Sequence, residues 1–97
     1  MYILLLTYTA PLEAVDAELE AHKVWVGEHF ATGAFVLAGR RVPRSGGFIL
    51  ATSLAREALD RIIAADPFVT AGVAVYDVYE VAPTRAADAL KGLLPTG

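Results

Sequence analysis

Four short stretches of the chain are rich in apolar, β-branched and aromatic residues, and we expect each of them to form a β-strand. They comprise residues 2–9, 34–39, 48–52 and 73–81. Proline and glycine mark their ends, because Pro11 follows the first stretch and the segment RRVPRSGG joins the second to the third as a hairpin loop.

Two longer segments between these strands show helical periodicity. The first spans residues 12–32 and ends near Gly33, whereas the second follows Ser53, which we expect to cap it, and closes at Pro67. Beyond the last strand, Thr84 is expected to cap a short C-terminal helix. The apolar face of the second helix carries Leu54, Ala58, Leu59, Ile62 and Ile63.

The resulting order, β-α-β-β-α-β with a tail, predicts an α+β fold of the ferredoxin-like type. In that arrangement the strands form an antiparallel sheet and two helices cover one of its faces. A chain of 97 residues is long enough for one domain and too short for two. We therefore expect a single domain over residues 1–97, with a core at 1–83 and a helical tail at 84–97.

Alternate residues of a strand face opposite sides of the sheet, and here both sets are apolar. This is unusual for a sheet with one face in water. The segments YILLLTY, AFVLAG and GFILA show this pattern. Because two helices cover one face only, the second face is expected to pack against the sheet of another subunit. This predicts a homodimer of the dimeric α/β barrel type. The alternative is a single sheet that leaves an apolar face exposed.

Composition narrows the function classes. The 56% hydrophobic content excludes a disordered chain, and the absence of cysteine excludes disulfides, thiolate metal sites and a cysteine nucleophile. A net charge of −3 weighs against a nucleic-acid partner. No apolar run is long enough to span a membrane, and the opening MYILLLTYT lacks the basic region of a signal peptide, so we expect a cytoplasmic protein.

The first predicted helix carries both histidines of the chain, His22 and His29. On a helical wheel, Val15, Leu19, His22 and Val26 fall within about 60° of one another, which places His22 in the apolar stripe. A buried imidazole needs a hydrogen-bond partner. Two interpretations stay open: a core histidine bonded to a backbone carbonyl, or a ring held by an acid through one nitrogen, with the other free for a substrate. His29, near the helix end, is interpreted as structural.

Asp66, in the segment AADPFVTAG, is the best candidate partner for His22. Both helices of a split βαβ fold lie on the same face of the sheet, so the end of the second approaches the middle of the first. The competing interpretation is that an aspartate before proline serves only a turn. Asp77, inside the last strand, is an alternative partner or a residue paired across a dimer interface.

Other residues are candidates for binding a ligand. Arg40, Arg41 and Arg44 gather in one loop, where they could hold a carboxylate or a phenolate, although a solvated hairpin end is the plainer interpretation. Aromatic residues, among them Tyr8 and Phe68, are candidates for a pocket wall or for the core. The two histidines lie roughly 10 Å apart along the helix, too far to ligate one metal, so we expect no metal.

Three segments carry a resemblance to a known family: MYILLLTYTAPLEAVDAELEAH, GAFVLAGRRVPRSGGFIL and AADPFVTAGVAVYDVYEVAPT. With them, the chain resembles the YciI-like (YCII-related) proteins of the dimeric α+β barrel superfamily from Met1 to about Pro83. The resemblance implies a ferredoxin-like subunit, a dimer built by packing sheet on sheet, and a pocket with a His–Asp pair, here His22 and Asp66. One branch of that family eliminates chloride from a chlorinated hydroxyquinol.

One position departs from that family. Many members have Gly-Pro where this chain has Gly39-Arg40, which places a cation near the expected pocket mouth.

Three hypotheses follow for function. The first is a cofactor-independent enzyme in which His22 and Asp66 transfer a proton during elimination or isomerisation of a small, aromatic or lactone, substrate. The second is a non-catalytic ligand-binding or structural dimer that uses the same pocket, with an anion seated among Arg40, Arg41 and His22. The third is a cofactor-free monooxygenase.

Overall fold

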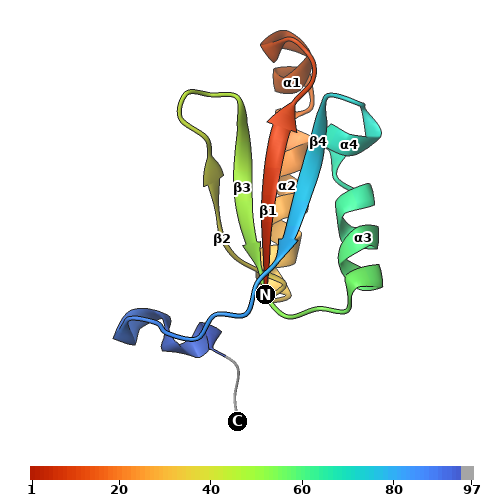
Figure 1. Cartoon of the computed structure of the whole chain (residues 1–97). Coiled ribbons are helices and arrows are strands. Elements are labelled where there is room, and N and C mark those ends of the chain that lie inside the picture. The colour runs from red at the N-terminus through yellow and green to blue at the C-terminus, as the bar shows by residue number, and fades with distance from the viewer. Residues whose placement is uncertain (95–97) are drawn as a thin grey trace.

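Four antiparallel strands form the sheet of this protein, for which the computed structural model describes residues 1–94. The strands are β1 (Tyr2–Tyr8), β2 (Phe35–Arg40), β3 (Gly46–Ala51) and β4 (Ala74–Glu80), in the spatial order β2-β3-β1-β4 (Figure 1). This order and the intervening helices are those of an α+β ferredoxin-like fold, as predicted. The strand β3 begins two residues earlier than expected, because Gly46 and Gly47 pair with β1.

The first helical segment is divided, contrary to the prediction of one helix over residues 12–32. Helix α1 (Leu12–Ala17) and helix α2 (Leu19–Ala31) are separated by Glu18, a turn residue with φ −103° and ψ 0° that belongs to neither helix. The division allows Val15 of α1 and Trp25 of α2 to enter two different parts of the core. The helix ends as predicted before Gly33, which adopts a positive φ of 82°.

The second helical segment is also divided in two. Helix α3 (Arg56–Ala64) is followed by the short helix α4 (Pro67–Thr70), so Pro67 starts a new turn as well as following the end of α3. The predicted cap by Ser53 is wrong, because Ala55 precedes α3 and makes no side-chain cap. The Ser53 hydroxyl instead accepts a hydrogen bond from the amino terminus of Met1 at 3.1 Å.

One face of the sheet lies against the helices and forms the core. In β1, the side chains of Tyr2, Leu4 and Leu6 are buried, whereas Ile3 and Leu5, on the opposite face, are only half-buried. Helix α2 runs behind the sheet in Figure 1, and α3 and α4 lie on the side of β4. Two clusters make up this core, one of Tyr2, Leu4, Trp25, Ala34, Phe35, Ile49, Ala51 and Leu59, and one of Leu6, Val15, Phe68, Val73 and Ala74.

The chain leaves the sheet after β4 as an extended segment that points away from the helices (Figure 1). It ends in a 3₁₀-helix, η1 (Asp88–Leu93), so the predicted α-helix capped by Thr84 is wrong. Leu90 remains exposed there, and without burial of an apolar face a segment this short does not sustain an α-helix. Residues 95–97 of the predicted tail lie outside the described residues. None of the described helices has the length and apolar character needed to cross a membrane.

Candidate active site

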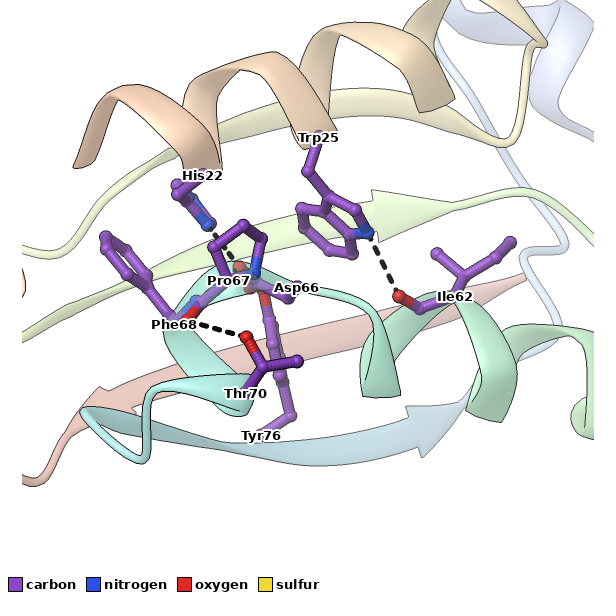
Figure 2. Close-up of polar contacts among 8 residues, drawn as sticks. All are labelled: His22, Trp25, Ile62, Asp66, Pro67, Phe68, Thr70 and Tyr76. Atoms are coloured by element: carbon purple, nitrogen blue, oxygen red, sulfur yellow. Dashed lines mark hydrogen bonds and ion pairs between the residues drawn. The ribbon is translucent and has the colours of Figure 1, made fainter. Parts of the chain in front are cut away.

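A histidine and an aspartate from separate helical segments meet on the helix-covered face of the sheet. His22 projects from α2 toward the junction of α3 and α4, where Asp66 lies (Figure 2). The His22 Nδ1 atom is 2.8 Å from Asp66 Oδ1. Asp66 is 0% exposed, and the side chain of His22 is 14% exposed. The structure thus brings together the two residues that the sequence singled out, at hydrogen-bond distance.

Three donors converge on the Asp66 carboxylate. Besides His22, the backbone N–H of Phe68 donates to Oδ1 at 2.9 Å, and the hydroxyl of Tyr76 donates to Oδ2 at 2.6 Å. The Phe68 bond is the N-cap of α4, so Asp66 also begins that helix. Because every partner donates, the carboxylate acts as a pure acceptor, and its orientation is set from three directions.

This arrangement determines the tautomer of the imidazole. Since the carboxylate accepts at Nδ1, that nitrogen carries the proton, and in the neutral ring Nε2 presents a lone pair. No residue within 1–94 makes a hydrogen bond to Nε2, and no buried side-chain nitrogen or oxygen atom of that part of the chain lacks a partner. Nε2 is therefore accessible to solvent, as a general base must be.

Tyr76 is a member of this site that the sequence analysis did not assign to Asp66. Burial raises the pKa of its hydroxyl, and the neighbouring Asp66 charge and hydrogen bond raise the pKa further, so the hydroxyl stays protonated as a donor. The alternation of side chains along β4 could have identified Tyr76, because it places Tyr76 on the helix-covered face of the sheet together with Ala74. Asp77 has the opposite parity, pairs in register with Leu5 and is exposed. The alternative that Asp77 is the partner of His22 is therefore wrong.

Aromatic rings fix the position of the imidazole. The Phe68 ring stacks on the His22 ring, with centroids 3.9 Å apart and planes at 9°. Trp25, one turn further along α2, donates its indole N–H to the carbonyl of Ile62 at 3.0 Å and so ties α2 to α3 (Figure 2). His29 contacts the rings of Trp25 and Phe35, at centroid distances of 5.4 and 5.2 Å, away from Asp66.

A pocket of about 320 Å³ opens beside His22, between α2 and the strands β2 and β3. Its size suits one small molecule. The stripe of α2 that the helical wheel identified lines this pocket, which explains why His22 is partly exposed and not sealed in the core. Tyr8, Phe68 and Arg40, the residues expected to contact a ligand, all lie in the wall, which consists of Leu6, Tyr8, Leu19, His22, Lys23, Val26, Ala38, Gly39, Arg40, Gly46, Gly47, Phe48, Ile49, Phe68 and Tyr76.

The three loop arginines have separate environments. Arg41 donates to the hydroxyl of Thr7 at 3.1 Å, on the sheet face away from the helices. Arg44 pairs with Asp16 of α1 and lies over the Tyr8 ring, 5.9 Å from its centroid. The hydrogen bond from Arg44 lowers the pKa of Asp16. Arg40 alone of the three reaches the pocket wall. Within residues 1–94, no three metal-ligating side chains of His, Cys, Asp or Glu gather at one place.

Comparisons with known proteins support the architecture. A model of the YCII-related domain family matches residues 1–82. Among solved structures, the chain resembles 5-chloro-2-hydroxyhydroquinone dehydrochlorinase from Burkholderia phenoliruptrix, solved in complex with 2,5-dihydroxybenzoquinone, with a TM-score of 0.70 and 17% identity. The match covers 84% of this chain and 93% of the other. No curated protein sequence matches the chain. At this level of identity, the structural likeness shows the shared fold.

Proposed function

The chain belongs to the YCII-related domain family, and from that premise we propose that it is a small cofactor-independent enzyme that moves a proton with His22. The observation that carries this proposal is the state of the imidazole. Its Nδ1–H is held by a buried carboxylate at 2.8 Å, and its Nε2 is accessible in the wall of a pocket. A histidine held in this way is suited to act as a general base.

The proposed reaction is an elimination or an isomerisation. His22 Nε2 takes a proton from the substrate, and the freed electron pair either expels a leaving group or shifts a double bond. Asp66 keeps the imidazole in the reactive tautomer and stabilises the imidazolium that forms. The proton then passes to solvent or returns to another atom of the substrate. Tyr76 and the Phe68 N–H hold Asp66 in place during this cycle.

The dehydrochlorinase with the same fold supports an elimination on a small ring. That protein removes the elements of hydrogen chloride, according to its name, and was solved with a six-membered quinone. A pocket of about 320 Å³ with aromatic walls is compatible with one such ring. The substrate of the present chain is proposed by this analogy of fold and pocket, since the two sequences share 17% identity.

We also propose that the protein functions as a homodimer. The sheet face opposite the helices is largely apolar, with Leu37 51% exposed and both Val75 and Tyr79 53% exposed, and Asp77 is an exposed charged residue on it. A second subunit that stacks its own sheet on this face would bury these side chains. The comparison of a single subunit with the dehydrochlorinase supports the fold required for such packing.

The enzyme proposal is tested with 5-chloro-2-hydroxyhydroquinone by following chloride release, and with non-chlorinated hydroxyquinols, with and without a ring carboxylate, by following uptake of deuterium from heavy water. The wild type is expected to catalyse one of these reactions. His22→Asn should lower the rate by about 10²- to 10⁴-fold, because the general base is lost. His29→Asn is the matched control, since His29 lies on the same helix but does not contact Asp66.

Two results would contradict the proposal. The first is a rate for His22→Asn equal to that of the wild type, which would remove His22 from the chemistry. The second is a wild type that catalyses neither reaction, which would favour a protein that binds its ligand without transforming it.

A further inference from the structure

The pocket has a charge opposite to that of the whole chain. Its wall contains the cations Arg40 and Lys23, and none of the residues that line it carries a carboxylate. The Asp66 carboxylate lies behind the wall, where it accepts hydrogen bonds from His22 and Tyr76. The chain as a whole has a net charge of −3. A cavity lined by one sign of charge between apolar walls concentrates its field on a bound ion. The pocket is thus electrostatically complementary to an anion.

Arg40 is positioned to provide that complementarity. It follows Ala38 by two residues on β2, and Ala38 packs against the core, so both side chains project to the helix-facing side of the sheet. Arg40 pairs in register with Gly47, and Gly46 precedes Gly47 on β3, so the strand beside Arg40 carries no side chain at these two positions of the wall. Within residues 1–94 the guanidinium makes no hydrogen bond and no ion pair, unlike those of Arg41 and Arg44.

Lys23 is a weaker candidate for the same task. It lies next to His22 on α2 and, like Arg40, is exposed, but its ammonium group is already 3.6 Å from the carboxylate of Glu20. An exposed ammonium near a carboxylate contributes little to the binding of a further anion. The planar fork of a guanidinium, in contrast, matches the two oxygens of a carboxylate with parallel hydrogen bonds.

We propose that this site selects a small planar molecule that bears a carboxylate, with the carboxylate on Arg40 and the reacting C–H or O–H group at His22 Nε2. The flat part of the molecule would lie among aromatic side chains of the wall, Tyr8, Phe68 and Tyr76. The inference rests on the proposed function and names the substrate class for it. Arg40 acts as the specificity-determining residue, separate from the acid–base pair.

Benzoate and its neutral isostere benzamide test this proposal by isothermal titration calorimetry. The wild type should bind benzoate about 10- to 100-fold more tightly than benzamide, because charge-assisted hydrogen bonds to Arg40 are available only to the acid. Arg40→Gln should abolish this preference, and Arg40→Lys should restore part of it, since a charge returns without the planar fork. Arg61→Gln, which removes the same charge from the outer side of α3, should leave the preference intact.

Equal affinities of the wild type for the two ligands, or no binding of benzoate, would overturn the carboxylate assignment. A preference that survives Arg40→Gln would overturn the role of Arg40. These failures are separable from a failure of the enzyme proposal, because binding is measured without turnover. His22→Asn is expected to keep the preference for benzoate even though it lowers the catalytic rate.

Discussion

Asp66 joins the fold and the candidate site at the scale of a single residue. One of its oxygens caps α4 through the Phe68 N–H and also accepts the Nδ1–H of His22, while the other oxygen accepts from Tyr76. From the sequence, capping a turn and holding His22 are alternative interpretations of an aspartate before proline. In the structure the same carboxylate does both. A change at this position should disturb stability as well as chemistry.

Asp66→Ala is expected to lower the free energy of unfolding by about 3 kcal/mol or more, because three donors in a buried site lose their acceptor. Asp60→Ala is the control. Asp60 is an exposed aspartate that pairs with Arg56 at 2.9 Å on the surface of α3, and its loss should cost about 1 kcal/mol or less. Urea denaturation measures both. Equal, small losses would show that Asp66 is not an organising residue.

Individual site residues were predictable to different degrees. His22 was visible because a helical stripe of apolar residues contained a titratable ring, and Asp66 because the topology brings the two helix ends together. Tyr76 was missed as a partner of Asp66 because strand parity indicates a face but not which hydroxyl reaches which carboxylate. Asp77 was an incorrect alternative for a related reason, since its parity directs it to the far face.

At the scale of elements, Gly46 shows how closely β3 approaches β1, and Gly27 in α2 provides the contrast. A Cβ atom on Gly46 would lie 1.8 Å from the carbonyl oxygen of Leu6 in β1, whereas a Cβ atom on Gly27, in α2, would meet nothing within 4 Å. Because Gly46 is part of the pocket wall, its close packing against β1 also shapes the site.

Gly46→Ala is therefore expected to destabilise the protein by about 2 kcal/mol or more, since the β1–β3 pairing must shift to admit the methyl group. Gly27→Ala should instead stabilise it by about 0.5 to 1 kcal/mol, because alanine favours a helix interior. Thermal and chemical denaturation of the two variants compare the same chemical change in two settings. A stable Gly46→Ala variant would contradict the described packing of β3.

Elements that depend on the periodicity of apolar residues could be predicted from the sequence. Features that depend on tertiary contacts could not. The four strands and the helix end at Gly33 were predictable from alternation and glycine placement. The break at Glu18 was not, because it depends on two core clusters that accept Val15 and Trp25 separately. The prediction of a C-terminal α-helix was wrong because η1 has no buried face. The expected domain core at 1–83 remains a prediction.

At the scale of the whole molecule, the uncovered sheet face is the main feature that a single subunit leaves unexplained. We predict that Val75→Lys, which places a charge on that face, converts a dimer to a monomer, as measured by light scattering after size-exclusion chromatography. Val24→Lys is the control, because Val24 is an exposed valine on the outer surface of α2. A wild type that is monomeric, or a Val75→Lys variant that stays dimeric, would contradict dimerisation through this face.

The role given to His22 depends on one tautomer, with the proton on Nδ1 and a lone pair on Nε2. Long-range proton–nitrogen NMR correlations of the neutral ring identify the protonated nitrogen directly and need no substrate. For the wild type we expect a protonated Nδ1 at His22, and for Asp66→Ala a loss of this fixed state. A proton found on Nε2 of His22 in the wild type would contradict the proposed general base.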